Sequence, residues 1–354
     1  MSYRELFKVG GLPVFQNKMF TDRVSALGCQ KGDITLVQDI NTGLIFNSSF
    51  DSSLLVYDAD YQNEQAFSGV FQRHLGDVEV VIRRLFSGKS LIEVGCGKGY
   101  FLEYLNRAGY QITGIDPAYE GSNPNIVRAI FKPELGLTAE GIILRHVLEH
   151  IPNPFEFLAS IAAANGGKGV VYIEVPCFDW ICQRRAWFDV FYEHVNYFRL
   201  ADFHRMFGTI YEIGHIFGGQ YLYVVAELAT LRKPVSNLSD TFTFPTDFLA
   251  GIDRFSEMAK GSRCAIWGGA SKGVIFSLYL QRAGVTIDCV IDINPAKQNK
   301  FMATSGLLIS SPAEGMKLMQ SGDTLFVMNS NYLQEIITQS NNQLHYIKVD
   351  QNEF

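Results

Sequence analysis

The chain has 354 residues, of which 47% are hydrophobic and 19% are charged, and its formal net charge is −6. This length exceeds one ordinary core and fits two or three domains. A nucleic-acid partner normally requires a basic stripe, and the chain has no run of five Lys or Arg, so we expect no such partner. No apolar run reaches the roughly 18 residues of a membrane helix, and no apolar signal core opens the chain, so we expect a cytoplasmic protein without a membrane partner.

The six cysteines are scattered along the chain, and none of them forms a CxxC pair. Scattered thiols are typical of a reducing compartment. A closed zinc site needs about four Cys or His ligands. We therefore expect no bound metal, and the oligomeric state stays open.

The first 70 residues contain short apolar stretches, at 34–37 and 43–46, that are broken by turn residues. This pattern predicts a small β-rich region, followed by an amphipathic helix that ends near Arg84. Strands and helices then alternate as far as about residue 175. The predicted strands are 91–95, 111–116, 126–131, 141–146 and 170–176, and the predicted helices are 100–109 and 153–164. Such alternation predicts an α/β fold with a doubly wound parallel sheet.

A further helix and strand are predicted within 198–230, and the Pro-, Ser- and Thr-rich segment 231–246 predicts a linker. After a helix at 247–260, a second strand–loop–helix–strand order occupies 264–294, and a strand at 321–329 and a helix at 332–339 follow. The chain is therefore expected to contain two nucleotide-fold-like units.

A glycine loop joins the strand at 91–95 to the following helix. Its glycines would let a ligand approach the main chain closely, and Asp116 ends the next strand, where a carboxylate can bind both ribose hydroxyls. Such a loop suits either NAD or S-adenosylmethionine. Glu93 would repel a pyrophosphate but suits a sulfonium and an amino group, and Tyr100 stands where a dinucleotide loop has its third glycine. We therefore predict S-adenosylmethionine as the cofactor.

The segment 144–154, LRHVLEHIPNP, ends the fourth strand of this unit. Ligands bind at the carboxyl edge of open α/β sheets, so its basic side chains are candidates for the site. The predicted cofactor-binding residues are Glu93, Gly95, Cys96, Gly97, Asp116, Arg145 and His146.

Several spaced motifs together are more specific than any one of them. They are EVGCGKG, HVLEHIP, YIEVP, FYEHVNYF, FGGQYLYVVAEL, WGGASKG, IDINPAKQ and MNSNYLQEI. In this order, over about residues 50–340, the chain resembles the three-part sugar-nucleotide C-methyltransferases. The resemblance implies a β-rich region at 1–70 that is a degenerate zinc module, a class I methyltransferase domain at 71–232, and a C-terminal Rossmann-like domain at 233–354. It also implies that a nucleotide sugar lies between the last two.

The resemblance further implies catalytic residues. It implicates Glu193 and His194 as a pair with His194 as the base, it places His150 at the sugar, and Tyr61 matches a tyrosine that precedes the catalytic domain. By its chemistry, Glu193 could orient His194 or stabilise its protonated form. Methylation of a carbon beside a ketone needs a base and a donor for the enolate oxygen. The EHVNY segment could instead be a polar cluster that bridges two domains.

Two departures from the family pattern affect these expectations. The family's module has four cysteine ligands, whereas only Cys29 remains here, so we expect the metal to be lost while the β scaffold persists. Phe191 replaces the family's usual tyrosine, so the enolate donor would be His150 or Tyr192.

The nucleotide part of the substrate has candidate partners in two segments. Arg184 and Arg185 could bind a diphosphate or could be a basic surface pair. The loop at 268–273 is typical of an anion site, and it could belong to a sugar-nucleotide site, a vestigial dinucleotide fold or a real NAD site. The predicted substrate-binding residues are Arg184, Arg185, Gly269, Ser271, Lys272 and Asp292.

The sequence thus predicts an S-adenosylmethionine-dependent methyltransferase that methylates a carbon of a nucleotide-linked keto-sugar through an enolate. One alternative is an O- or N-methyltransferase on a related sugar or small molecule, which needs less acid–base help. Another is a nicotinamide-dependent oxidoreductase that uses the C-terminal fold. A non-catalytic binding module fits least, because both the cofactor motif and the candidate catalytic histidines are present.

Overall fold

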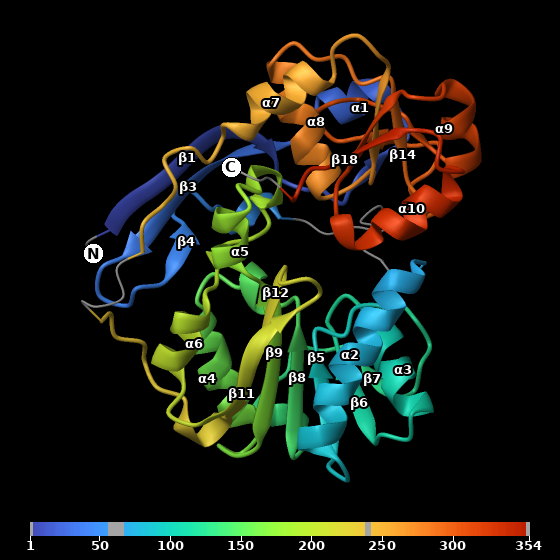
Figure 1. The fold of residues 1–354 in the computed structure, drawn as a ribbon. Coiled ribbons are helices and arrows are strands. Elements are labelled where there is room, and N and C mark those ends of the chain that lie inside the picture. Colours follow the sequence, from blue (N-terminus) through green and yellow to red (C-terminus); the bar gives the residue numbers. More distant parts are fainter. Residues whose placement is uncertain (1–2, 56–66, 238–241, 352–354) are drawn as a thin grey trace.

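The computed structural model describes residues 3–55, 67–237 and 242–351. In these ranges the strands form a four-stranded, a seven-stranded and a five-stranded sheet and one two-stranded pair. Figure 1 shows the seven-stranded sheet in the lower half of the molecule, the five-stranded sheet in the upper half, and the N-terminal strands beside both. Tyr61 lies outside the described residues.

The β-rich N-terminal region that the sequence predicted is present. Its sheet is antiparallel and takes its last strand from far along the chain; in spatial order the strands are β1 (Tyr3–Pro13), β3 (Lys31–Asp39), β4 (Ile45–Asn47) and β10 (Asn196–Tyr197). The short β2 (Met19–Phe20) pairs instead with β15 (Phe301–Met302), and α1 (Arg23–Leu27) contacts β15. The region therefore contacts both α/β units.

The seven-stranded sheet confirms the predicted class I methyltransferase fold. Numbered along this unit, the strands lie in the order 3-2-1-4-5-7-6, and the last two are antiparallel to their neighbours. The strands are β5 (Leu91–Val94), β6 (Ile112–Ile115), β7 (Ile126–Val127), β8 (Gly141–Arg145), β9 (Val170–Pro176), β11 (Ile210–Ile216) and β12 (Tyr221–Glu227). The predicted strand at 126–131 shortens to two residues, because β7 is at the edge of the sheet and pairs only with β6.

Alternate residues of these strands pack against opposite layers of helices. Ile92 and Ile142 join the cluster that contains α4 (Pro154–Ala164) and α6 (Leu200–Met206). Leu91 and Ile143 join the cluster that contains α2 (Gly69–Phe86) and α3 (Tyr100–Arg107). The central strands β5, β8 and β9 are buried on both faces, which explains why they are almost continuously apolar in sequence.

The C-terminal unit is a five-stranded parallel sheet covered by helices. Its strands, in spatial order, are β16 (Ile309–Ser310), β14 (Cys289–Ile291), β13 (Cys264–Trp267), β17 (Thr324–Val327) and β18 (His345–Lys348). Its helices are α7 (Gly251–Met258), α8 (Lys272–Arg282), α9 (Pro312–Leu318) and α10 (Leu333–Gln339). The predicted linker at 231–246 contains no helix or strand element where it is described.

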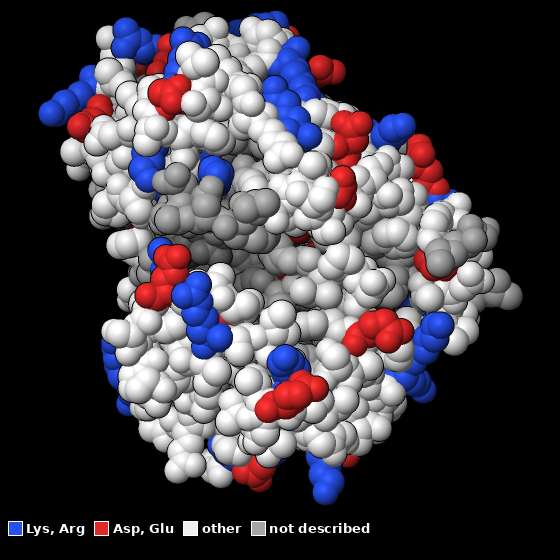
Figure 2. Space-filling view, turned by 180° about the vertical axis from the view of Figure 1, so that it is seen from behind, with Lys and Arg blue, Asp and Glu red and all other residues white. Residues whose placement is uncertain are grey.

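The two α/β units face each other, and the molecule is hollowed between them (Figure 2). No helix in the described ranges has both the length and the apolar character needed to cross a membrane.

Candidate active site

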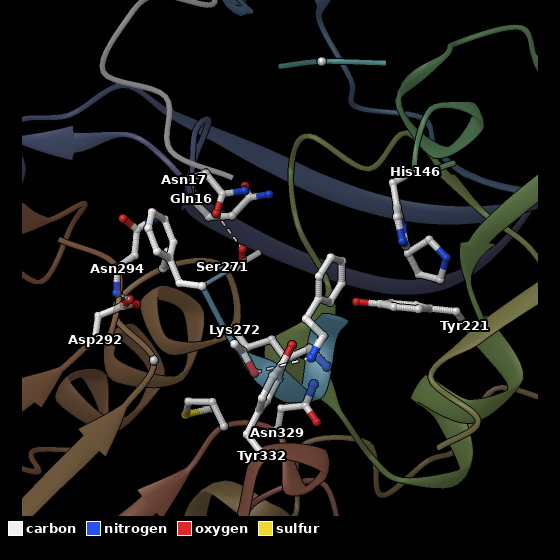
Figure 3. A pocket seen from close by; sticks show the side chains of 18 of the residues that line it. Gln16, Asn17, His146, Tyr221, Ser271, Lys272, Asp292, Asn294, Asn329 and Tyr332 are labelled. Carbon is white, nitrogen blue, oxygen red and sulfur yellow. Dashed lines mark hydrogen bonds between the residues drawn. The ribbon is translucent and has the colours of Figure 1, made fainter. Parts of the chain in front are cut away.

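A cavity of about 430 Å³ lies between the two α/β units. It is lined at the carboxyl ends of β5 and β8 on one side and of β13, β14 and β17 on the other. Gln16 and Asn17, from the N-terminal region, complete the wall (Figure 3). The carboxyl edges of both parallel sheets, where open α/β folds bind ligands, therefore share one space.

The first glycine loop lies on the methyltransferase side of this cavity. The Gly97 N–H donates to Asp116 Oδ2 at 2.8 Å, and the Ala118 N–H donates to Oδ1 of the same carboxylate at 2.8 Å. Asp116 does not itself line the cavity but lies one hydrogen bond behind it. Gly97 has a φ of 55°, and a Cβ atom added there would meet nothing within 4 Å. The loop therefore presents open main chain to a ligand.

Glu93 is a buried acid in the wall beside this loop. Its side chain is 4% exposed, and Oε2 has no hydrogen-bond partner among the described residues. Burial raises its pKa to about 7, nearby Arg145 opposes the rise, and Asp116 adds to it. An unpaired buried carboxylate suits a cationic group. Together with the open glycine loop, it fits S-adenosylmethionine, which carries both a sulfonium and an amino group.

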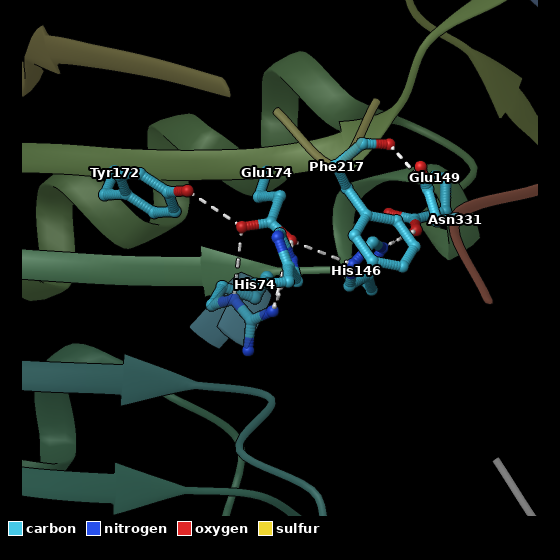
Figure 4. A network of polar contacts seen from close by, with 8 residues as sticks. His74, His146, Glu149, Tyr172, Glu174, Phe217 and Asn331 are labelled. Carbon is cyan, nitrogen blue, oxygen red and sulfur yellow. Dashed lines mark hydrogen bonds and ion pairs between the residues drawn. The ribbon is translucent and has the colours of Figure 1, made fainter. Parts of the chain in front are cut away.

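A buried carboxylate network lies under the loop that follows β8 (Figure 4). Glu174 Oε1 lies 2.9 Å from His74 Nε2, 3.1 Å from Arg145 Nη2 and 3.1 Å from His146 Nε2, and Oε2 accepts from the Tyr172 hydroxyl at 2.8 Å. Burial alone would raise the pKa of Glu174. Arg145 and His146 nevertheless hold this pKa well below its usual range. Arg145 and His146, which were predicted to bind the cofactor, line the cavity, but Arg145 Nε and Nη2 and His146 Nε2 are already bonded to Glu174.

His146 connects this network to the next acid. Its Nδ1 lies 3.4 Å from Glu149 Oε1. Burial alone would lower the pKa of His146. The bonds to Glu149 and Glu174 outweigh this effect and raise the pKa to about 9. Its φ of 52° is a left-handed conformation that non-glycine residues rarely adopt. The paired carboxylates thus hold a positively charged imidazole in a strained loop.

Two predicted catalytic histidines come together with Glu149, which the prediction omitted. One nitrogen or oxygen of each of Glu149, His150 and His194 lies within 4.8 Å of the others. The ring centroids of His150 and His194 are 5.0 Å apart. Burial and the neighbouring His150 lower the pKa of His194 to about 3, so the ring is neutral near pH 7.

His150 has a fixed tautomer. Its Nδ1 lies 3.0 Å from the main-chain oxygen of Glu193, which can only accept, so Nδ1 carries the proton. Burial lowers the pKa of His150, so the ring is neutral and Nε2 is an acceptor. This corrects the expectation that His150 donates to an enolate oxygen, because neutral His150 has no proton on Nε2.

The other predicted catalytic residues of this segment face the N-terminal region. Glu193 is fully buried, does not line the cavity, and accepts from the Gln16 N–H at 3.3 Å. The Tyr192 hydroxyl accepts from the Asp51 N–H at 2.9 Å, and this ring also lies outside the cavity wall. The structure therefore does not support Tyr192 as an enolate donor. Phe191 lines the cavity, with its ring centroid 4.9 Å from that of His194.

The second glycine loop repeats the geometry of the first. The Gly269 N–H donates to Asp292 Oδ2 at 2.8 Å, as Gly97 does to Asp116. Ser271 and Asp292 line the cavity, whereas Gly269 lies behind it.

The predicted cations for a diphosphate differ in their placement. Lys272 lines the cavity, but its Nζ lies 2.9 Å from Asp189 Oδ2 and from Gln220 Oε1. Neither Arg184 nor Arg185 lines the cavity, and Arg185 pairs with Asp247 at 2.8 Å. Arg184 and Arg185, which were predicted to bind the substrate, therefore lie outside this cavity.

Comparisons with known proteins agree with this arrangement. Residues 70–210 match the family model of a methyltransferase domain, and residues 246–347 match the model of the C-methyltransferase C-terminal domain. C-methyltransferase NovU of Streptomyces niveus is 29% identical over 148 residues, which cover 38% of this chain and 35% of NovU. The ubiquinone biosynthesis O-methyltransferase of Caulobacter vibrioides is 27% identical over 112 residues, which cover 27% of this chain and 44% of that protein.

The chain thus spans less than half of the length of these curated relatives. Among solved structures, the plantazolicin methyltransferase BpumL in complex with SAH is 15% identical, with a TM-score of 0.36 over 46% of this chain and 86% of that one. The two family models cover most of the two α/β units, apart from β11 and β12, and leave the N-terminal sheet largely outside the match. Residues 70–210 therefore match a methyltransferase domain, whose cofactor is S-adenosylmethionine, and residues 246–347 match the C-terminal domain of the C-methyltransferases.

Proposed function

We propose that the protein transfers a methyl group from S-adenosylmethionine to a carbon beside the ketone of a nucleotide-linked sugar. One observation carries this proposal. His150, His194 and Glu149 line the same cavity as the cofactor loop, so a base and its partners lie beside the methyl donor's domain. Transfer to oxygen or nitrogen needs less acid–base help than transfer to carbon.

S-adenosylmethionine supplies an electrophilic methyl group when it is bound, and Glu93, Gly95, Cys96 and Gly97 would hold it, with Asp116 supporting the loop from behind. Neutral His194 takes the proton from the sugar carbon, and the imidazolium that forms lies close to the Glu149 carboxylate. Glu149 thus takes the stabilising role that the chemistry of the sequence suggested for Glu193. His150 Nε2 orients the sugar by accepting a hydrogen bond from one of its hydroxyls.

The C-terminal loop would bind the nucleotide part of this substrate. Ser271 and Asp292 face the cavity opposite the cofactor loop, and Asn329 and Tyr332 lie beside them (Figure 3). The C-terminal domain is itself of the kind found in C-methyltransferases. A nucleotide sugar is therefore the proposed partner, rather than a nucleic acid or a membrane.

The test is a turnover screen of nucleotide keto-sugars with labelled S-adenosylmethionine, followed by His194→Asn. We expect a carbon-methylated product, and exchange of the sugar's α-proton with heavy water in the native protein. The His194→Asn variant should lose this exchange and about 10² to 10⁴ of the turnover, a typical general-base factor, while still binding S-adenosylmethionine.

The matched control is His204→Asn, at an exposed histidine on α6, which should retain full activity. A product methylated on oxygen or nitrogen, formed without α-proton exchange, would replace this proposal with the alternative methyltransferase. A nicotinamide cofactor retained at the C-terminal loop, detected by mass spectrometry of the purified protein, would support an oxidoreductase.

A further inference from the structure

Glu149, His150 and His194 have the composition and spacing of a metal-ligand set. Each offers one ligand atom, and these atoms all lie within 4.8 Å of one another. Glu149 is 1% exposed, and its Oε2 has no hydrogen-bond partner in the described part of the chain. Two imidazoles and one carboxylate are common ligands of zinc and of neighbouring transition metals.

Two of these ligands are held by partners behind them. His150 Nδ1 donates to the Glu193 main-chain oxygen at 3.0 Å, which leaves Nε2 free to bind an ion. Glu149 Oε1 lies 3.4 Å from His146 Nδ1, and His146 is fixed in turn by Glu174. Metal-binding histidines usually donate their second ring N–H to a carbonyl or a carboxylate in this way.

The charge and the location also suit a divalent ion. The one carboxylate neutralises half of the charge of such an ion, and three protein ligands leave a coordination position open toward the cavity. The sequence analysis expected no bound metal, because no CxxC pair supplies ligands for a closed site of about four Cys or His residues. Glu149, His150 and His194 belong instead to two separate motifs, LEHI and FYEHVNYF.

We propose that Glu149, His150 and His194 bind one divalent transition-metal ion, such as Zn²⁺, and that this ion competes with methylation. Binding removes from His194 the lone pair that would accept the substrate proton. The competition rests on the proposed function, whereas the binding of the ion does not.

Calorimetric titration of the full chain with zinc alone tests the site. A Cys29→Ser background removes the cysteine that is partly exposed and could bind zinc by itself. We expect one ion per chain, and at least about 100-fold weaker binding in Glu149→Gln and in His194→Asn, since losing even an outer partner costs about 10- to 100-fold. His204→Asn should leave zinc affinity unchanged.

Cobalt gives a readout that needs no ligand variant. Titration of the Cys29→Ser protein with Co²⁺ should produce visible absorption bands of nitrogen- and oxygen-bound cobalt, and zinc should remove them. Zinc affinity that is unchanged in both ligand variants, or cobalt that binds without these bands, would overturn the site.

The competition is measured separately. Zinc should inhibit methylation and α-proton exchange together, and a chelator should restore both. Stoichiometric zinc binding at these residues with turnover unchanged would overturn the competition. If no keto-sugar is methylated, the calorimetry still decides the metal site, so failure of the proposed function and failure of this inference give different results.

Discussion

Glu93 shows how a single residue can lower stability and still serve binding. It is 4% exposed and has an unpaired oxygen, and its folded-state pKa is about 7 against an ordinary value of 4.5. Between these values the unfolded chain loses the proton while the folded chain keeps it. The contribution of protonated Glu93 to the free energy of unfolding is therefore fully present below pH 4.5. It is lost as the pH rises from there through 7.

We therefore expect Glu93→Gln to be more stable than the native protein at pH 8, by on the order of 3 kcal/mol, and equally stable at pH 4. Denaturant unfolding of the cofactor-free proteins at both pH values measures this. The same variant should bind S-adenosylmethionine at least tenfold more weakly, about 1.4 kcal/mol, because it removes the negative charge. Equal stability at pH 8 would show that the carboxylate is solvated rather than buried.

The residue types at the strand ends predicted much of the candidate site. The sequence did not predict which side chains contact one another within it. Glu93, His150 and His194 were predicted and do line the cavity. Glu149 was omitted even though it lies next to His150 in the sequence. The assignment of Glu193 rather than Glu149 as the acid beside His194 failed because it required knowing how β10 joins the N-terminal sheet.

Secondary-structure elements were predictable in proportion to their length and burial. The parallel strands of the seven-stranded sheet are apolar runs bounded by turns, and α2 and α4 follow helical periodicity. Strand β11 was not predicted, because it lies at the edge of the sheet and its residues are half-buried or exposed. The two-residue strands β10 and β16 carry no such signal, because their pairing is set by packing between distant segments. The polar strand β1 was missed for a related reason, since it lies mostly exposed at the edge of its sheet.

The loop and helix of the C-terminal unit offer a prediction at the scale of one element. A Cβ atom at Gly273, in the first turn of α8, would lie 1.8 Å from the main-chain oxygen of Gly268. Main chain cannot move aside cheaply, so Gly273→Ala should destabilise the protein by at least about 2 kcal/mol. It should also disturb the second glycine loop.

Gly76→Ala in α2 is the matched control. Its Cβ atom would be 3.6 Å from the Tyr104 hydroxyl, an ordinary contact, and alanine is the better helix former, so it should be neutral or stabilise by up to about 1 kcal/mol. Thermal unfolding compares the two variants. Equal melting temperatures would show that the stability of the protein does not depend on the close approach of α8 to its loop.

At the scale of the whole molecule, polar contacts join all three parts around the cavity. Lys272 Nζ lies 2.9 Å from Asp189 Oδ2 across the two α/β units. The Ser271 N–H donates to the Gln16 main-chain oxygen at 3.0 Å, which attaches the N-terminal region. Glu335 on α10 accepts from the Ser68 hydroxyl at the start of α2, at 2.9 Å. The cavity therefore depends on contacts between segments that lie far apart in the sequence.

The Lys272–Asp189 pair provides the test of this dependence. Its side chains are 15% and 9% exposed, and removing one partner of a buried pair leaves the other charge uncompensated. Lys272→Met should therefore lower the free energy of unfolding by about 3 kcal/mol, and adding Asp189→Asn should recover part of the loss. Trp180 reports on the pair by fluorescence, because Lys272 Nζ lies 5.1 Å from the centre of its ring.

The control is Lys260→Met, in an exposed pair with Glu257, which should change the stability by less than about 0.5 kcal/mol. If the two lysine variants lost equal stability, or if Asp189→Asn added to the loss, the pair would not be what joins the two units.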